Sequence, residues 1–549
     1  MAVAVAWHLW AVLVVPANYD VLSYHLPLAW NYQAALTGEW RMFYADTPLG
    51  APALQRLVSW RSGGGVGAAM VPAIAMLGGA SCVASLALRC GARRKGSALA
   101  AALYLWHPMA TGASLQHLTD PLVALYALAG AELLVASRSQ APGRSRWLAG
   151  LGGFVLASAA TVKLSAVAIT LLPLAGALLI ARLISGDARR DLARAAGFAA
   201  LGGAIAMAPW MIRAAWFLDA PFPWLVAWTA EQRALVVEAH GPQTPLEPSY
   251  WASVLARLGD FGFAFSAGPT RVSAAAAGAL ALMVLRRRSP AAALAAAGLA
   301  GVFAHALLAG QPARFLLPNV GLACAAVGVL AGSLRPARWR GPALALICAA
   351  VAWQVVVGSL TLLQARPAIT REGRIAALAG FLGGPLIEAY LAAESLPKDA
   401  KLLVLFDARG ALLPRSAAYT TVWDRWDWLA EGSTTARSAF ASGYTHVLVN
   451  EFEWNRLVMF YGLDRHPVVA GDSASVRNRY AEQWLRAYPP AGGADADAVL
   501  RFLRHARLGA TFQSGGGPRG SEIWLAPLPV PGSLEPQSFE ALLFPPWNL

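Results

Sequence analysis

Apolar and polar positions follow one another along this chain in long blocks rather than in single alternation. Apolar runs separated by short polar connections occupy the part of the chain before about residue 363. A helix needs roughly 20 apolar residues to cross the hydrocarbon core of a bilayer. The pattern therefore predicts about eleven transmembrane helices. They are expected near residues 1–15, 64–88, 97–115, 120–137, 147–162, 164–183, 195–213, 272–286, 290–309, 315–334 and 341–363.

The connections between these helices carry an uneven distribution of charge. Every second connection is short and rich in Arg or Lys, at residues 89–96, 138–146, 181–190, 286–290 and 335–341. Basic loops stay on the cytoplasmic side of a membrane. The pattern places the N-terminus in the cytoplasm, and it places residues 16–63 and 214–271 in loops at the outer face. An odd number of spans then puts the C-terminal region outside.

Composition supports a membrane protein and argues against a nucleic-acid-binding protein. Hydrophobic residues make up 57% of the chain and charged residues only 13%, about half the charged share of a soluble protein. The net charge of +14 comes from the basic connections, so topology accounts for it and a nucleic-acid partner is not expected. The four cysteines lie in or beside apolar runs, which argues against a disulfide framework.

The chain changes character after the last apolar run. Residues 396–419 read as a strand, a turn and a second element, and the runs at 445–450 and 522–528 read as further strands. Residues 475–488 and 497–507 between them read as helices. This predicts a C-terminal α/β domain at 364–549, outside the cytoplasm (periplasmic), after a membrane domain at 1–363. A domain of this length is ordinary.

The first candidate for chemistry is Asp20, a few residues beyond the first apolar run. Tyr24 and His25 follow it in a polar, aromatic loop. A carboxylate at the membrane surface can act as a general base, with these two neighbours contacting a substrate. An acid on a solvated loop with no role in chemistry fits the same spacing.

Asp120 is the second candidate, in a segment that also carries His117 at the outer mouth of a span. An acid at a membrane end is costly unless it faces water or a partner, which favours a functional role. Thr119 or Asp120 before Pro121 is also a good start for a helix. The two interpretations are compatible.

Three cations lie on the same predicted side of the membrane. Lys163, Arg213 and Arg314 each fall at or near the start of an outer connection. Each one alone is explained by a basic side chain extending from the apolar region to the interface. Together they predict a mouth that binds phosphate, since the Arg fork can contact two oxygens at once.

These residues resemble a known family. The elements are D-x-x-x-Y-H-L-P at Asp20–Pro27, T-D-P-L at Thr119–Leu122, T-x-K-x-S at Thr161–Ser165, P-W-x-I-R at Pro209–Arg213 and R-F-L-L-P at Arg314–Pro318. Their order resembles that of GT-C fold glycosyltransferases, including protein O-mannosyltransferases (glycosyltransferase family 39) and the lipid A aminoarabinose transferase. The chain departs from the family where Val21 replaces the second acid of the mannosyltransferases and where Ala214 replaces a usual Asn.

The resemblance implies an enzyme that takes a sugar from a polyprenyl-phosphate donor. The acceptor would be a glycan, lipid or protein at the outer face of a bacterial cytoplasmic membrane, and such enzymes usually invert the anomeric carbon. Asp20 and Asp120 would be catalytic, while Tyr24, His25, His117, Lys163, Arg213 and Arg314 would bind substrate. No cofactor is required, although the two acids could hold a divalent metal through oxygen ligands.

Three alternatives fit parts of the pattern. A transporter or flippase would move lipid or polysaccharide without chemistry, but internal repeats and polar residues within spans are expected of it. A glycan polymerase or ligase on another membrane fold would share the donor type. A non-catalytic partner subunit is compatible with the missing second acid after Asp20.

Overall fold

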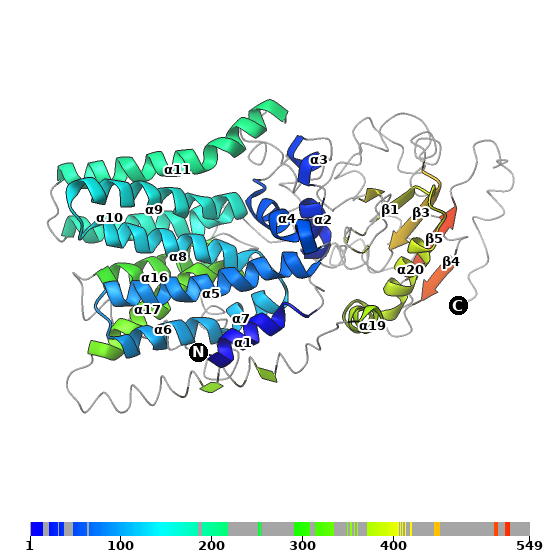
Figure 1. Cartoon of the computed structure of the whole chain (residues 1–549), viewed down its shortest axis with the longest axis horizontal. Coiled ribbons are helices and arrows are strands. Elements are labelled where there is room, and N and C mark those ends of the chain that lie inside the picture. The colour runs from blue at the N-terminus through cyan, green and yellow to red at the C-terminus, as the bar shows by residue number, and fades with distance from the viewer. Residues whose placement is uncertain are drawn as a thin grey trace.

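A computed structural model shows the arrangement of the chain (Figure 1). It describes residues 2–14, 21–30, 32–37, 48–62, 65–184, 189–217, 290–307, 313–333, 370–405, 418–419, 444–450, 510–513 and 522–527, and a few single positions between these ranges. Long helices lie side by side in a bundle, and a small sheet with two further helices lies beyond one end of it. The described part of the chain is therefore mostly helical.

The bundle is built from apolar helices that run back and forth between its two ends. They are α1 (Ala2–Ala11), α5 (Gly65–Arg89), α6 (Arg94–Trp106), α7 (Pro108–Leu115), α8 (Asp120–Ser137), α9 (Pro142–Val162), α10 (Leu172–Ile184), α11 (Arg189–Phe217), α16 (Pro290–Leu307) and α17 (Leu317–Ser333). A π-helical turn η3 (Val167–Leu171) leads into α10, and a 3-10 turn η4 (Ala313–Leu316) leads into α17.

Six helices within the described ranges are long and apolar enough to cross a membrane. They begin at Ala69, Asp120, Val167, Arg190, Pro290 and Arg314. This confirms a multi-pass helical membrane protein. The count of eleven spans stays a prediction, because the span expected at 272–286 and most of the one at 341–363 lie outside the described residues.

The single helix predicted at 97–115 is wrong. The structure ends α6 at Trp106 and begins α7 at Pro108, with His107 in an extended conformation between them. The ring of a proline clashes with a helical conformation of the residue before it. The imidazole of His107 instead accepts a hydrogen bond from the Met109 amide and starts the new helix.

Close packing between α9 and α11 depends on glycine. A Cβ atom on Gly153 would overlap the backbone of Ala199, and a Cβ atom on Gly202 would overlap the carbonyl oxygen of Gly150. Small residues let two membrane helices approach to backbone contact. The same device joins α6 to α17, where a Cβ atom on Gly96 would overlap the backbone of α17.

The first predicted outer loop forms short helices at one end of the bundle. They are η1 (Val21–His25), α2 (Leu26–Trp30), α3 (Tyr32–Thr37) and α4 (Gly50–Ser62). The connections from α5 to α6 and from α8 to α9, which are rich in basic residues, lie at the opposite end (Figure 1). The structure thus separates the predicted outer and inner connections, while the compartment at each end stays a prediction.

The C-terminal part contains a mixed five-stranded sheet in the order β2-β1-β3-β5-β4. Its strands are β1 (Leu402–Leu405), β2 (Ala418–Tyr419), β3 (His446–Asn450), β4 (Ala510–Gln513) and β5 (Glu522–Pro527). β1 is parallel to β2 and β3, whereas β5 is antiparallel to β3 and β4. The strand predicted within 396–419 and those predicted at 445–450 and 522–528 are present as β1, β3 and β5. The helices expected at 475–488 and 497–507 lie outside the described residues.

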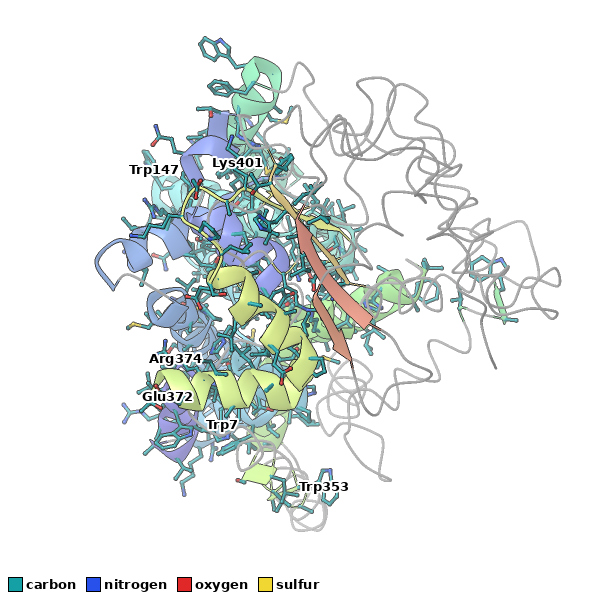
Figure 2. The ribbon with its side chains drawn as sticks, turned by 90° about the vertical axis from the view of Figure 1, so that its right-hand side faces the viewer. Trp7, Trp147, Trp353, Glu372, Arg374 and Lys401 are labelled. Carbon is teal, nitrogen blue, oxygen red and sulfur yellow. The ribbon has the colours of Figure 1, made fainter. Side chains whose placement is uncertain are left out.

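Two helices, α19 (Arg371–Leu382) and α20 (Gly384–Glu394), accompany this sheet. Seen from the end of the bundle, both helices and the strands lie in front of the membrane helices (Figure 2). The sheet is therefore at the same end as α2, α3 and α4. The domain boundary predicted at residue 363 falls outside the described ranges and remains a prediction.

A buried polar network joins α20 to β1 and β3. Asp407, which follows β1, accepts hydrogen bonds from the Tyr390 hydroxyl, the Arg409 guanidinium and the Asn450 amide at 2.5, 2.9 and 2.7 Å. Burial, with the neighbouring Asp407 carboxylate, raises the pKa of the Tyr390 phenol well above its usual value, so the phenol stays a donor. The mutual pairing lets this acid be buried, since an unpaired buried charge is costly.

The glycine contact between α9 and α11 predicts that alanine substitutions at two glycines of α11 change the stability of the protein differently. Gly202→Ala should destabilise the protein by roughly 1–3 kcal/mol, because the added methyl group overpacks a backbone contact. Gly197→Ala should be neutral or stabilising, because no atom lies within 4 Å of a Cβ there and alanine favours a helix. Melting temperatures of both purified variants in detergent measure the difference; equal melting temperatures would contradict the packing argument.

Candidate active site

The start of α8 presents an acidic side chain away from its own helix. The predicted helix start is confirmed, since Asp120 is the first residue of α8 and Thr119 precedes it at the cap position, with Pro121 next. The Thr119 hydroxyl, however, makes no hydrogen bond to the first turn of α8. The polar side chains here are thus free to serve other elements, and the Asp120 carboxylate is directed towards neighbouring helices.

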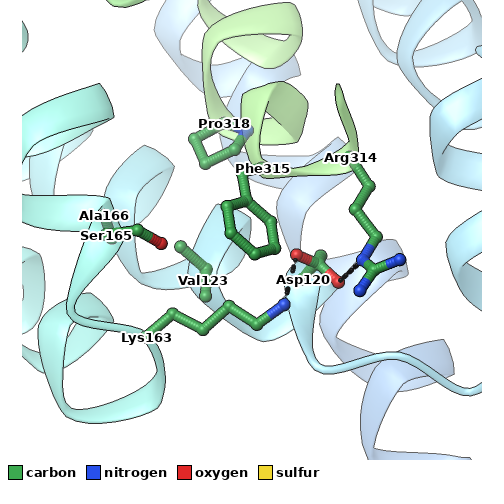
Figure 3. A pocket seen from close by; sticks show the side chains of 8 residues that line it. All are labelled: Asp120, Val123, Lys163, Ser165, Ala166, Arg314, Phe315 and Pro318. Atoms are coloured by element: carbon green, nitrogen blue, oxygen red, sulfur yellow. Dashed lines mark hydrogen bonds and ion pairs between the residues drawn. The ribbon is translucent and has the colours of Figure 1, made fainter. Parts of the chain in front are cut away.

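Two cations from different helices converge on the Asp120 carboxylate (Figure 3). The Lys163 ammonium, at the end of α9, donates a hydrogen bond to Oδ1 of Asp120 at 2.9 Å. The Arg314 Nε, in η4, lies 3.5 Å from Oδ2 of the same carboxylate. The Asp120 side chain is 2% exposed, against 13% for Lys163 and 25% for Arg314. Lys163 and Arg314 therefore do not simply extend to the membrane interface. Both form ion pairs with Asp120.

The charges of this cluster favour an anion. Among the residues that the structure describes here, one carboxylate against two cations leaves one net positive charge, in a place where water is largely excluded. Charged groups near a membrane are stable only when they are paired or face water, and Asp120 has both oxygens facing cations. Lysine and arginine side chains held together in this way can also bind a phosphate group.

The cluster lines a pocket that includes residues not singled out from the sequence. Its lining is formed by Asp120, Val123, Lys163, Ser165, Ala166, Arg314, Phe315 and Pro318. Val123 lies one helical turn after Asp120, and Figure 3 shows the Ser165 hydroxyl pointing towards the pocket. Phe315 lies with its ring 4.1 Å from the Lys163 ammonium. Ser165, Phe315 and Pro318 stand in the T-x-K-x-S and R-F-L-L-P elements of the sequence, but those elements predicted no chemical role for them.

His25 connects the first outer loop to this site. Its Nε2 shares a hydrogen bond with the Thr119 hydroxyl at 3.3 Å, directly beside Asp120. Burial lowers the pKa of His25 well below its usual value, and the charges of Lys163 and Arg314 lower it further. His25 is therefore neutral at physiological pH and joins η1 to the start of α8 without adding charge.

His117 lies in the turn before α8, and its contact with substrate stays a prediction. It is 3% exposed, and its Nε2 donates a hydrogen bond to the Ala11 carbonyl at 2.9 Å. Its backbone has a φ of 54°, in the left-handed region that suits few residues other than glycine. The contact fastens the end of α1 to the turn before α8, and His117 is not among the pocket-lining residues.

Arg213 is also outside the lining of this pocket. Its Nε donates a hydrogen bond to the Leu36 carbonyl at 3.1 Å, and it is buried in α11. Its charge opposes the rise in pKa that burial causes in Tyr32 of α3. Arg213 thus holds α3 of the first loop against α11, rather than joining Lys163 and Arg314 at the pocket.

Two other predicted residues are not placed. Asp20 lies outside the described residues, and only the backbone of Tyr24, within η1, is described. The described residue after Asp20 is Val21, which is fully buried at the start of η1. Within this segment, His25 places η1 beside Thr119.

The described part of the site does not match a divalent metal. Within it, no three His, Cys, Asp or Glu side chains gather as a ligand set. The pocket contributes one carboxylate, and both of its oxygens already face cations. A metal ion prefers several oxygen ligands and would be repelled by Lys163 and Arg314.

Comparisons with known proteins point to a fold. No protein-family model matches the sequence, and no curated protein matches it. A crystal structure of ArnT from Cupriavidus metallidurans bound to undecaprenyl phosphate is similar, with a TM-score of 0.54 and 14% identity over 83% of this chain and 93% of that one. The apo structure of the same protein gives a TM-score of 0.50 and 15% identity over the same shares.

At such low identity the likeness concerns the fold alone. It covers most of both chains. The expected fold class is confirmed: the chain is a multi-pass membrane protein with the GT-C fold.

Proposed function

We propose that this protein is a membrane glycosyltransferase that moves a sugar from a polyprenyl-phosphate-linked donor to an acceptor hydroxyl. The observation that carries the proposal is the convergence of Lys163 and Arg314 on the buried Asp120 at the mouth of the bundle. The GT-C fold supports it, since the similar ArnT structure contains undecaprenyl phosphate. The acceptor is a glycan, a lipid or a protein at the outer face of a bacterial cytoplasmic membrane.

The chemistry of transfer suits this arrangement. The acceptor oxygen forms a bond to the anomeric carbon as the bond from that carbon to the phosphate oxygen breaks. The leaving polyprenyl phosphate gains negative charge in this step, and fixed cations stabilise charge that develops in the transition state. Lys163 and Arg314 would bind the phosphate, and Asp120 would hold both cations in place while they do so.

The acceptor must also lose a proton, and Asp20 is the proposed base. It directly precedes η1, which the His25–Thr119 hydrogen bond fastens beside Asp120. Tyr24, in the same turn, is proposed to contact substrate. His25, His117 and Arg213 are proposed to act by fastening α1, η1 and α3 around the mouth.

Two asparagine variants test the proposed base and its supporting acid. Asp20→Asn keeps size but removes basicity, and loss of general-base assistance typically costs 10²–10⁴ in rate. Asp120→Asn should also lower the rate, because its two cations lose their shared partner. Sugar transfer from a polyprenyl-phosphate donor is measured in detergent after melting curves confirm folding. Near-normal turnover of folded Asp20→Asn would exclude the base, and normal turnover of both variants would exclude the site.

The role of Arg314 predicts a selective effect. Arg314→Ala should weaken use of the phosphate-linked donor by roughly ten- to a hundredfold, since hydrogen bonds to charged groups contribute about 1.5–3 kcal/mol, and should change acceptor dependence less. Arg190→Ala is the matched control, because Arg190 is exposed near the start of α11 at the opposite end of the bundle. Donor and acceptor KM values of both variants give the comparison. An unchanged donor KM in folded Arg314→Ala would contradict phosphate binding.

Membrane orientation is a separate test of the same proposal. Reporter fusions at Lys95, Arg144, Arg288 and Arg338 should report the cytoplasm, and a fusion at Gly492 should report the outer side, because basic connections remain inside. An outer location of any two of the four basic positions would place the Asp120 pocket on the wrong side for an outer acceptor.

A further inference from the structure

Phe315 occupies a special position in the Asp120 pocket. Its ring centre lies 4.1 Å from the Lys163 ammonium and 5.7 Å from the Arg314 guanidinium carbon. It follows Arg314 in the 3-10 turn η4, which turns both side chains into the same pocket. Figure 3 shows the ring between the Lys163 ammonium and Pro318, beside the Asp120 carboxylate.

The ring of Phe315 makes a cation–π interaction with the Lys163 ammonium in addition to its apolar packing. The face of an aromatic ring is electronegative and attracts a cation within about 6 Å of its centre, more strongly where water is excluded. Lys163 is 13% exposed, so its ammonium has given up much of its hydration. A leucine in place of Phe315 would pack against the same apolar neighbours, but it has no such face.

The ring can also hold the Lys163 ammonium in place when the proposed phosphate group binds to it. A phosphate that binds Lys163 competes with Asp120 for the donors of the ammonium, and lysine has a long, flexible side chain. A partner that does not compete for those hydrogen bonds is needed to hold the ammonium while its anionic partner changes. The face of Phe315 is such a partner.

We propose that Phe315 is a positioning residue for the phosphate group of the lipid carrier. Its ring holds the Lys163 ammonium at the mouth of the pocket both before and after the phosphate binds. This inference rests on the proposed function, and it adds a residue whose contribution passes through Lys163 rather than through contact with the reacting atoms.

The test is a double-mutant cycle on binding of undecaprenyl phosphate, the probe lipid, to the purified full chain. Phe315→Leu should weaken binding about 3- to 30-fold, the equivalent of roughly 0.7–2 kcal/mol at 1.4 kcal/mol per tenfold change. Phe315→Tyr, which keeps the ring face, should stay within about 2-fold of wild type. In a Lys163→Met background, Phe315→Leu should have no further effect, since the ring has lost its cation.

The control is Phe303→Leu, on an exposed face of α16 away from the pocket, which should leave binding unchanged. Equal loss from Phe315→Leu in the wild-type and Lys163→Met backgrounds would show that the ring acts by packing alone, and would overturn the inference. Unchanged binding of folded Phe315→Leu would overturn it as well. Absence of binding by the wild-type protein would instead reject the proposed function, and this inference with it.

Discussion

The pairing of one buried carboxylate with two cations is the interaction on which the functional end of this protein depends. Asp120 belongs to α8, Lys163 to the end of α9 and Arg314 to the turn before α17. An uncompensated charge at the edge of a membrane is strongly unfavourable, so the three elements are constrained to meet there. The same constraint leaves these three side chains with one net positive charge at the mouth, where the phosphate group is proposed to bind.

The rest of the bundle allows this meeting. Glycines bring α9 to α11 and α6 to α17 at backbone contact, which keeps the helix ends in register around the pocket. Asn319 of α17 donates a hydrogen bond to the Ile169 carbonyl in η3, so the helix after Arg314 is also fastened to the segment after Lys163. Apolar packing alone does little to fix the relative positions of membrane helices. These close contacts and hydrogen bonds fix them.

Histidine and arginine contacts attach the first loop to this end of the bundle. His117 holds the end of α1, the His25–Thr119 hydrogen bond holds η1, and Arg213 holds α3. Each contact ties a segment of the loop or its helix to a separate helix or turn of the bundle. A loop that is anchored in this way would hold the proposed base, Asp20, near the proposed phosphate site.

The sequence by itself determined the class of the protein, and it singled out Asp120 and the two cations that the structure pairs with it. Apolar runs report membrane helices because the bilayer demands a minimum length, and Asp120, Lys163 and Arg314 stood out because charges are rare at such edges. Only the tertiary structure decided which of the cations share one carboxylate. It separated Arg213 and His117 from the pocket and brought in Phe315, because neighbours across helices are set by packing and not by spacing along the chain.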